Sequence, residues 1–594
     1  MRSRSTVYLF ALLVLVFTSA AVSQTFRGSI RGTVTDSTGA AVSGAQVKVF
    51  SPDTGLSRTM TTNDEGEYSA SELPLGAYYV TVAKEGFETT TLTGIPVSVG
   101  APTRADVKLV TGRVQEAIEV TAQVPMVETT NNTTGGTIEA SEAAELPVNG
   151  HDYTKLLELA PGAASEPTGS TESAGSYGLF SLNGNRGRSN NYLLDGTDMN
   201  DGYRNLPAVN QAGVWGCPGT ILPVDALAEI PATGSPEAEF GRSSGATVNI
   251  VTKSGTNKFH GSFFENYRDG DLGARNYFNS FDPTTGLLQT KNSFTNHQFG
   301  GSVGGPIIKD RSFGFLAYEG QREDGGLPQV GYVPTLDDLT DFQSASGWDE
   351  TINPVVQNLL NINAWGVNPL PTTGGKEIFT TPFFNNSDNI IAKVDQHLHI
   401  FSPGDLLTGR YFYSHGTQMF PLGMAYTGAS APGYDTITPT HVNVVSLSYT
   451  SIPRPNLIVE LRAGYNRFLE QFLPQDGGLN PENTNLGLNT LPPGYNSHDL
   501  GLPEITVGPY IPSSPSISPD DGQAFSNLGV SPFQSRGRID TNYQVFGNVS
   551  LTKGRHNFKT GYEWRRTFIN SFINSGHRGT LKFSSLNDFL GGDH

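Results

Sequence analysis

A strict two-residue alternation between residues 250 and 319 is the feature that most constrains the fold of this chain. Two runs in this stretch each keep apolar or aromatic residues on one side of an extended chain and mixed residues on the other. The apolar positions are Phe259, Gly261, Phe263 and Tyr267 in the first run, and Phe313, Phe315 and Ala317 in the second. Runs of about ten residues with this period, separated by Gly, Asn and Asp turns, are typical of transmembrane β-barrel strands.

The N-terminus has the pattern of an export signal. Arg2 and Arg4 precede an apolar run over residues 7–17, and small residues follow it up to Ser23. This order predicts a secretory signal peptide over residues 1–23. The run is shorter than the roughly 20 apolar residues that a spanning helix needs, and no later segment reaches that length. Any membrane-embedded part of the chain is therefore expected to be a β-barrel.

Composition supports a mainly β chain of several domains. Its 594 residues include 69 Gly and 37 Pro, with 10% aromatic and only 16% charged residues, a mixture that favours turns and strands over helices. The net charge of −18 argues against nucleic acid and against anionic membrane surfaces as partners.

Residues 24–111 form a self-contained β pattern. Short apolar runs alternate with turn signals at residues 36–39, 63–66 and 74–76, which predicts a small β-sandwich. The motif over residues 32–47 and the Asn-Asp-Glu-Gly-x-Tyr motif over residues 63–68 resemble the carboxypeptidase regulatory-like domain. No His-x-x-Glu zinc pair is present, so the resemblance implies a module without catalysis. Asp36, Asp64 and Glu65 could bind a cation, but turn chemistry explains Asp36 and Asp64 without one.

Residues 112–255 predict a small α/β domain. A short helix is expected over residues 141–146 with Ser141 as its N-cap, and a second over residues 153–159. Four pieces, at residues 182–186, 192–196, 237–241 and 243–253, resemble in sequence and order the plug of TonB-dependent outer-membrane receptors of the Oar-like type. The resemblance implies a plug over residues 112–255 and a transmembrane antiparallel β-barrel over residues 256–594.

The barrel region predicts strand pairs with one lipid-facing side. Residues 457–467 alternate between an apolar file beginning at Leu457 and a more polar one, and residues 543–551 and 557–564 flank a tight turn. The segments 320–388 and 469–535 are rich in Pro, Asn and Gly and are expected to contain long external loops. Alternation places Asp395, His397 and His399 on one face of a strand. They extend too far along it to surround a metal ion, so they predict a polar lumen lining and no metal site.

About nine or ten barrel strands can be counted in this sequence. The resembled receptors close their barrels with about 22 strands. An unclosed barrel would leave unpaired backbone groups in lipid. We therefore expect the chain to be an N-terminal fragment or a truncated product of a longer receptor.

The resemblance implies an outer-membrane receptor that takes up an unidentified glycan, peptide or chelate through a plug-gated barrel. An inner-membrane TonB-type complex would supply the work. The segment Ile118, Glu119, Val120, Thr121 and Ala122 is either its contact site or the first plug strand. No catalytic residue, metal or cofactor is expected, since hydrolase motifs are absent.

Two questions on function stay open from the sequence. Arg186 and Arg188, in a Gly- and Asn-rich turn, could contact ligand at the plug apex or pair with lumen carboxylates. The alternative function is an outer-membrane adhesion or structural protein with a carbohydrate-binding β-sandwich.

Overall fold

The structure is a computed structural model of the whole chain, and it describes most of residues 27–592. The expected signal peptide lies outside the described residues. The gaps within the described range are residues 100–101, 113–116, 122–134, 147–150, 166–179, 210–218, 235–240, 243, 275–290, 292, 345–350, 403, 421–430, 455, 481–485, 509–524, 531–534 and 554–555.

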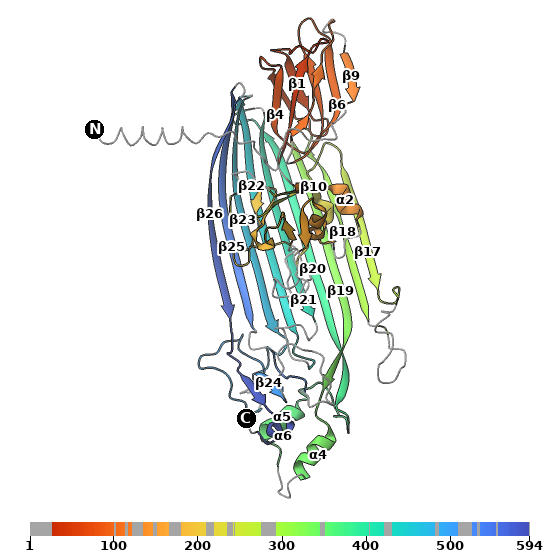
Figure 1. Cartoon of the computed structure of the whole chain (residues 1–594), viewed down its shortest axis with the longest axis vertical. Helices are drawn as coiled ribbons and strands as arrows, with labels where there is room; N and C mark the ends of the chain where they lie inside the picture. The colour runs from red at the N-terminus through yellow and green to blue at the C-terminus, as the bar shows by residue number, and fades with distance from the viewer. Residues whose placement is uncertain are drawn as a thin grey trace, which may run out of the picture.

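The N-terminal part is a β-sandwich of two sheets, as the turn spacing predicts (Figure 1). One sheet has the order β4-β1-β7, with β8 also paired to β1, and the other has the order β3-β2-β5-β6-β9. Alternate residues of both sheets meet in a buried core that includes Ile30, Val47 and Val80. The strands are β1 (Gly28–Thr35), β2 (Gln46–Phe50), β3 (Ser57–Thr61), β4 (Glu67–Leu73), β5 (Gly76–Ala83), β6 (Thr89–Val97), β7 (Pro102–Arg104), β8 (Val107–Lys108) and β9 (Ala117–Thr121).

The carboxylate of Asp36 stabilises a turn of the sandwich by accepting hydrogen bonds from the backbone. Its Oδ1 accepts hydrogen bonds from the backbone N–H groups of Thr38 at 2.8 Å and Ala40 at 2.9 Å. Asp64 accepts a hydrogen bond from the hydroxyl of Ser43 at 3.2 Å. The hydrogen bonds of Asp36 are local and agree with the turn interpretation. In the turn at Asp64 the side-chain acceptor is Asn63, which accepts from the backbone N–H groups of Glu65 and Glu67.

The second domain is a small α/β unit around a five-stranded sheet with the order β10-β15-β16-β13-β14. It also contains the β11–β12 hairpin and short helices. Its first helix begins one residue earlier than predicted, because Glu139 and not Ser141 is the N-cap and forms a capping box with Glu142. The elements are β10 (Gly135–Glu139), α2 (Ala140–Glu145), α3 (Tyr153–Leu156), η2 (Leu157–Leu159), β11 (Ala163–Ser165), β12 (Phe180–Leu182), η3 (Gly187–Ser189), β13 (Asn191–Leu194), β14 (Thr197–Asp198), η4 (Val224–Ala226), β15 (Leu227–Thr233) and β16 (Thr247–Thr252).

The third part is a nine-stranded antiparallel sheet in which neighbours in sequence are neighbours in space. Within the described residues the sheet is open, with β17 at one edge and β26 at the other (Figure 1). The strands are β17 (His260–Asp269), β18 (Phe294–Ile308), β19 (Ser312–Tyr332), β20 (Lys376–Leu398), β21 (Asp405–Phe420), β22 (Thr436–Arg454), β23 (Leu457–Pro474), β25 (Arg536–Lys553) and β26 (His556–Ile573).

The helices among the described residues are each too short or too polar to cross a membrane.

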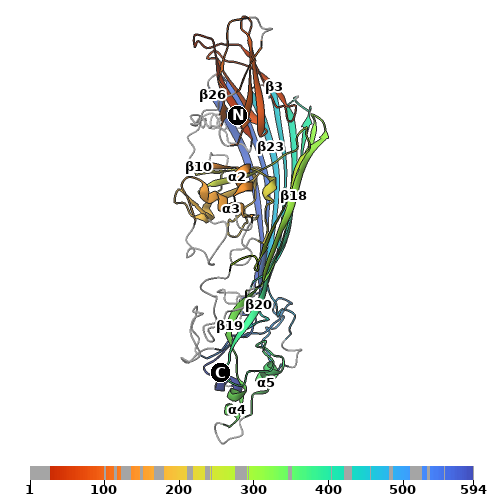
Figure 2. The same ribbon diagram turned by 90° about the vertical axis from the view of Figure 1, so that its right-hand side faces the viewer.

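The barrel sheet is curved, and the α/β unit lies against its concave side (Figure 2). We call this side the inner face and the convex side the outer face. One hydrophobic core joins the two units, since Ile230 and Val248 of the α/β unit belong to the same buried cluster as Phe315, Ile391 and Phe412 of the barrel sheet. The α/β unit is thus the plug of this barrel wall.

The apolar residues of the two alternating runs at the start of the barrel sequence lie on opposite faces of the sheet. Phe259 and Phe263 are exposed on the outer face, at 77% and 83%, whereas Phe313 and Phe315 are buried at 1% and 3%. The expectation that apolar files face lipid and polar files face the lumen is therefore wrong for β19. The plug supplies an apolar surface that the inner file of β19 packs against.

The long loops predicted outside the barrel pack into a separate cap at the end opposite the sandwich (Figure 1). Its core includes Trp365, Leu359 and Phe589, and the rings of Trp365 and Phe589 meet edge to face at 5.7 Å. The sequence indicated loops here, but not that they share a core. The cap elements are α4 (Leu336–Ser344), α5 (Pro354–Asn361), β24 (Glu504–Val507), β27 (Thr580–Phe583) and α6 (Leu586–Gly591).

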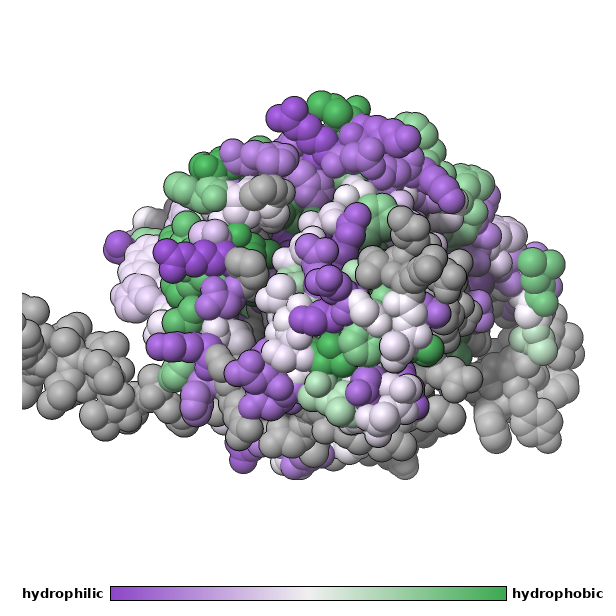
Figure 3. Space-filling view, turned by 90° about the horizontal axis from the view of Figure 1, so that it is seen from above, coloured by the Kyte–Doolittle hydropathy of each residue, from purple (hydrophilic) through white to green (hydrophobic). Residues whose placement is uncertain are grey.

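The opposite end, formed by the sandwich, has no broad apolar surface in the view along the long axis. Hydrophobic residues there lie in small groups among hydrophilic and neutral ones (Figure 3). Such a surface suits contact with water, because large exposed apolar patches favour association.

Candidate functional site

The plug contacts the barrel wall through a loop that carries three aspartates at a spacing of three residues. Asp195, Asp198 and Asp201, here called the aspartate series, are all buried. The loop begins where β13 ends in an Asp-Gly turn: Asp195 has a φ of 45° and Gly196 a φ of 71°. Both values are left-handed, a conformation that Asp-Gly pairs favour in tight turns between antiparallel strands. The turn directs the chain toward the inner face of the barrel.

Asp195 lies between two cations of the barrel wall. Its Oδ2 is 2.9 Å from Nη1 of Arg410 on β21 and 3.8 Å from Nζ of Lys393 on β20. The backbone N–H and hydroxyl of Thr252 in the plug also donate to this carboxylate. Burial by itself raises the pKa of Asp195, but Lys393 and Arg410 outweigh it, so the pKa is lowered and the carboxylate is charged.

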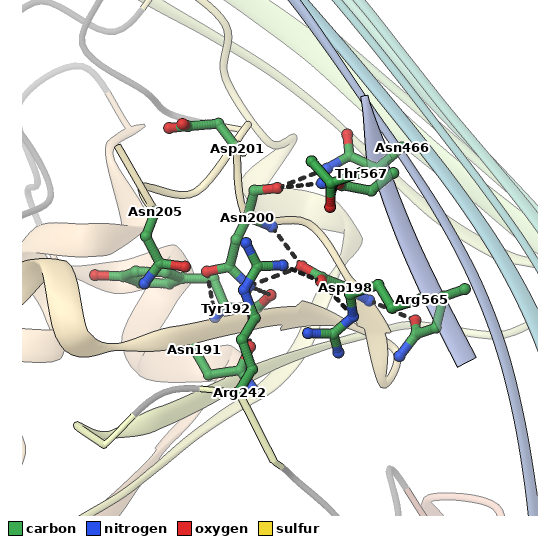
Figure 4. Close-up of polar contacts among 12 residues, drawn as sticks. Asn191, Tyr192, Asp198, Asn200, Asp201, Asn205, Arg242, Asn466, Arg565 and Thr567 are labelled. Carbon is green, nitrogen blue, oxygen red and sulfur yellow. Dashed lines mark hydrogen bonds and ion pairs between the residues drawn. The ribbon is translucent and has the colours of Figure 1, made fainter. Parts of the chain in front are cut away.

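Asp198 joins the plug to the edge strand β26 (Figure 4). Its carboxylate pairs with Arg242 of the plug and with Nε of Arg565 on β26 at 3.1 Å. Asn200 donates to the same carboxylate from its backbone and from its side chain, each at 2.8 Å. The backbone N–H of Asp198 donates to Oε1 of Gln544 on β25 at 3.0 Å. One residue thus contacts two neighbouring barrel strands.

Asp201, the last member of the aspartate series, pairs with Arg538 on β25. Its Oδ1 is 3.3 Å from Nη1 of Arg538, whose Nη2 is 3.2 Å from Oε2 of Glu470 on β23. The carboxylate of Asp201 also accepts hydrogen bonds from the backbone N–H groups of Tyr203 at 2.8 Å and Leu206 at 3.1 Å. It therefore shapes the plug loop and binds the barrel at once.

Backbone oxygens of the same loop accept further hydrogen bonds from the wall. Nη1 of Arg462 donates to the carbonyl oxygen of Gly196 at 2.5 Å. The amides of Asn466 and Asn542 donate to the carbonyl oxygen of Asn200 at 3.3 and 2.7 Å (Figure 4). All these contacts come from barrel side chains, so the loop is held without strand pairing to the wall.

A second contact involves His151, at the start of the plug helices. Its Nδ1 is 2.8 Å from Oε1 of Glu319 on β19, and its Nε2 is 3.0 Å from the side-chain amide of Asn266 on β17. Oε2 of Glu319 also accepts the backbone N–H of Val224. Burial lowers the pKa of His151, but the hydrogen bond and charge of Glu319 outweigh it, and the pKa is raised. Low pH therefore strengthens this contact.

The plug is also tied to the sandwich. Oε2 of Glu229 on β15 accepts a hydrogen bond from the backbone N–H of Val99, which follows β6, at 2.8 Å. Burial raises the pKa of Glu229 to about 7, and the nearby Glu139 adds to this effect. The contact couples the end of the sandwich to the sheet of the plug.

Of the predicted ligand contacts, Arg186 is the N-cap of η3 and Arg188 lies within it, and both are exposed. Neither forms an ion pair within the described part of the chain, so the predicted pairing with lumen carboxylates is not found. The inner-face carboxylates are engaged elsewhere, as Glu470 with Arg538 and Glu460 with Arg462 show. Contact with ligand remains a prediction.

The segment predicted as a TonB contact or first plug strand is part of the sandwich in the structure. Residues 118–121 form β9, which pairs in parallel with β6 of the sandwich, Ile118 opposite Thr90 and Val120 opposite Leu92. The interpretation as a plug strand is therefore wrong, because β6 provides the neighbouring edge. Ala122 lies outside the described residues.

The residues Asp395, His397 and His399 do not form a metal site. Asp395 accepts a hydrogen bond from the hydroxyl of Thr408 at 2.6 Å, and His397 packs edge to face on Phe313. The strand ends at Leu398, before His399. Within the described residues, no group of three metal-ligating side chains occurs.

The sequence analysis missed the aspartate series and its cations. A signal was present, because Arg410, Arg462 and Arg538 lie within strands of the barrel sheet. Buried arginines of this kind require carboxylates. The partners could not be chosen, since the pairs are more than 200 residues apart in sequence.

Comparisons with known proteins agree with this architecture. Residues 29–110 match the model of the carboxypeptidase regulatory-like domain, and residues 251–594 match that of the outer membrane beta barrel domain. The TonB-dependent transporter Oar of Myxococcus xanthus is 30% identical over 349 residues, which are 56% of this chain and 30% of that protein.

Two solved structures illustrate the range of structural matches. The outer membrane transporter YddB of Escherichia coli has a TM-score of 0.41 at 14% identity over 74% of this chain and 48% of its own. The ferripyoverdine receptor of Pseudomonas aeruginosa has a TM-score of 0.39 at 12% identity over 75% and 53%. The chain thus spans about half of these two structures, and its match covers under a third of Oar. By the match over residues 251–594, more than half of its length, the chain belongs to the outer membrane beta barrel domain family and is an outer-membrane protein.

Proposed function

We propose that this chain takes part in TonB-dependent uptake of a ligand across the outer membrane, with the plug as the gate. In this proposal the plug blocks the passage along the inner face of the barrel wall. A periplasmic partner, energised from the inner membrane, pulls on the segment before the plug and moves it. No catalytic step is assigned to any residue.

The attachment of the plug by side chains is the observation that carries this proposal. Within the described residues, the five-stranded plug sheet and the nine-stranded barrel sheet share no strand pairing. The plug is held by packing, by the aspartate series and by His151. Such contacts can be broken and re-formed one at a time, whereas a shared strand would have to be pulled out of a continuous array of backbone hydrogen bonds.

The position of β9 supports a pulling site before the plug. In its sheet β9 is the last strand, paired to β6 on one side only. An edge strand offers free backbone groups to which an extended partner strand can add. The proposed contact over residues 118–122 is therefore a β-strand addition at the outer edge of β9.

The proposed ligand is a glycan, a peptide or a chelate. Oar is named as a TonB-dependent transporter, and the ferripyoverdine receptor was solved with ferripyoverdine bound. The exposed Arg186 and Arg188 are proposed ligand contacts, because a planar guanidinium suits carboxylates and other anionic groups.

Binding to a TonB-type periplasmic domain tests the proposal directly. The full chain, extracted from membranes, is passed over an immobilised domain of this type from the same cell. Separate variants Glu119→Pro and Val120→Pro serve as probes, because successive N–H groups of a strand point to opposite sides. One proline removes a donor toward β6 and the other removes a donor at the outer edge.

We expect the wild-type chain to bind and the outer-edge proline to abolish binding. Lys108→Gln, on the other sheet of the sandwich, is the matched control and should bind normally. Equal binding of both proline variants and the wild type would contradict the proposal. A deletion strain that loses attachment to surfaces while retaining uptake would favour the adhesion alternative.

A further inference from the structure

Two arginines and two histidines lie close together on the outer face of the barrel wall, away from the plug. We propose that His415, His441, Arg467 and Arg566, here called the outer cationic patch, bind the phosphate group of an anionic lipid in the outward-facing leaflet of the membrane. The inference concerns the lipid-facing surface and does not depend on the transported ligand.

The position of the patch follows from the pattern of the outer face. Short turns join β18 to β19, β20 to β21, β22 to β23 and β25 to β26 at the sandwich end, and the cap of long loops is at the other end. Outer-membrane barrels have short turns on the periplasmic side and long loops outside the cell. The long-loop half of the outer face therefore adjoins the outer leaflet.

Polar residues interrupt the apolar outer files near that boundary. On the sandwich side of this boundary, the outer files expose apolar residues such as Val445, Leu461 and Val545. Toward the long loops, the outer files of eight of the nine strands each contain a charged residue or a histidine, and that of β25 contains Thr541. The eight residues are Glu265, His297, Arg322, Asp388, His415, His441, Arg467 and Arg566. Cations at such a boundary lie at the depth of lipid headgroups.

These eight residues, here called the boundary row, divide into two halves. On β17 to β20 they pair with one another: His297 is 3.1 Å from Glu265, and Arg322 is 2.8 Å from Asp388. Asp388 lies opposite His415 in the register but accepts hydrogen bonds from Arg322 and Tyr318. This half of the row is therefore close to neutral.

In the other half, the carboxylate of Asp388 interacts with His415 across the boundary between the halves. The long-loop ends of the outer files on β21, β22, β23, β25 and β26 contain no Asp or Glu. Arg467 and Arg566 are exposed and form no ion pair within the described part of the chain. The rings of His415 and His441 stack at 4.2 Å with their Nδ1 atoms 3.2 Å apart.

Two tyrosine side chains form the surface between the two arginines on which a headgroup would rest. Tyr465, Tyr543 and Arg566 are opposite one another on three adjacent strands, and the two tyrosine rings are 5.4 Å apart. Arg467 and Arg566 are two strands apart, or about 10 Å across the sheet. A phosphate over the tyrosines is within reach of both guanidinium groups, which bind phosphate in a bidentate manner.

This local surface has the opposite sign to the chain as a whole. The net charge of −18 repels anionic surfaces in general, so an anionic lipid must find its attraction in a local group of cations. The outer cationic patch is such a group and lies where the headgroups are. Charge complementarity therefore selects an anionic phosphate lipid over a zwitterionic one.

Quenching of tryptophan fluorescence by brominated lipids tests the inference on the full chain in detergent. Trp564 lies on the same outer file as Arg566 and is 43% exposed, so lipid bound at the patch comes close to it. The probes are dibrominated phosphatidic acid, which has a phosphomonoester, and dibrominated phosphatidylcholine. We expect phosphatidic acid to quench at a much lower mole fraction than phosphatidylcholine.

Paired variants separate charge from fold. A basic residue near an anionic lipid surface contributes about fivefold in affinity, so Arg467→Gln with Arg566→Gln should weaken phosphatidic acid binding about 30-fold. Arg467→Lys with Arg566→Lys should retain most of the binding. Lys108→Gln with Arg454→Gln removes the same charge from exposed sites elsewhere and should have no effect.

Three results would overturn the inference. Equal quenching by both lipids would show that the patch does not distinguish an anionic lipid from a zwitterionic one. Unchanged affinity in the glutamine pair would show that the arginines do not bind the lipid. Equal loss in the lysine and glutamine pairs, whether through binding or through folding, would show that charge is not the cause.

Discussion

The inner and outer faces of the barrel wall are made of the same strands but are stabilised differently. On the inner face, Asp195 and Arg410 pair at 2.9 Å with side chains 3% and 0% exposed. On the outer face, Arg322 and Asp388 pair at 2.8 Å with side chains 39% and 42% exposed. The distances are nearly equal, so the difference lies in burial. The comparison teaches that removing one partner matters most where water cannot replace it.

The largest expected effect follows from breaking the inner pair. Asp195→Ala leaves the buried guanidinium of Arg410 and the ammonium of Lys393 without their shared carboxylate. Loss of one partner of a buried ion pair costs about 3–5 kcal/mol. Hydrogen exchange of the backbone amides of β16 in the full chain reports the opening free energy of the plug and should fall by this amount.

The matched control for that experiment is Asp388→Ala on the outer face. Exposed ion pairs contribute about 0–1 kcal/mol, so the exchange of the β16 amides should change little. If the two substitutions had equal effects, burial would not distinguish the two faces.

A second comparison uses two adjacent isoleucines that face opposite ways. Ile391 is fully buried against the plug, and Ile390 is 37% exposed on the outer face. Ile391→Ala leaves a cavity in the joint core and should cost about 2–5 kcal/mol of plug docking. Ile390→Ala creates no cavity beneath the plug. Protease resistance of the plug in membranes, measured against temperature, should fall for Ile391→Ala alone.

The smallest expected effect is a pH dependence of plug docking. The folded pKa of His151 is raised above its ordinary value of about 6.5. The stabilising contribution of its pair with Glu319 is therefore complete below about pH 6.5 and is lost as the pH rises through the folded pKa. Plug opening, followed by the same amide exchange, should become easier over this range. His151→Gln should remove that part of the dependence.

The outer-face control for the histidine experiment is His297→Gln. His297 and Glu265 are about half exposed at 46% and 52%, so water screens their interaction. This variant should keep the wild-type pH profile of plug opening. A profile flattened equally by both substitutions would mean that His151 has no special role.

Local patterns in the sequence account for much of the fold. Gly and Asp turn signals located the sandwich strands, and the tight turn after residue 551 located the β25–β26 hairpin, in which Lys553 pairs with His556. The alternating file from Leu457 to Tyr465 faces outward as expected, with Leu461 54% exposed. These features depend on neighbours within a few residues, which is why sequence reasoning reaches them.

Features that depend on distant partners were missed or misplaced. The segment 118–121 joined the sandwich because β6 offered a free edge. The core of the cap brings together residues as distant as Trp365 and Phe589. Local propensity does not contain this information.

The sequence by itself determined that the barrel strands have two distinct faces, because side chains in a strand alternate with a period of two. It did not determine which face is which. The aromatic file of Phe259 and Phe263 turned outward, and that of Phe313 and Phe315 turned inward. Only the tertiary structure decided this, because the plug buries the inner face of β19 and supplies an apolar surface where the sequence alone predicts water.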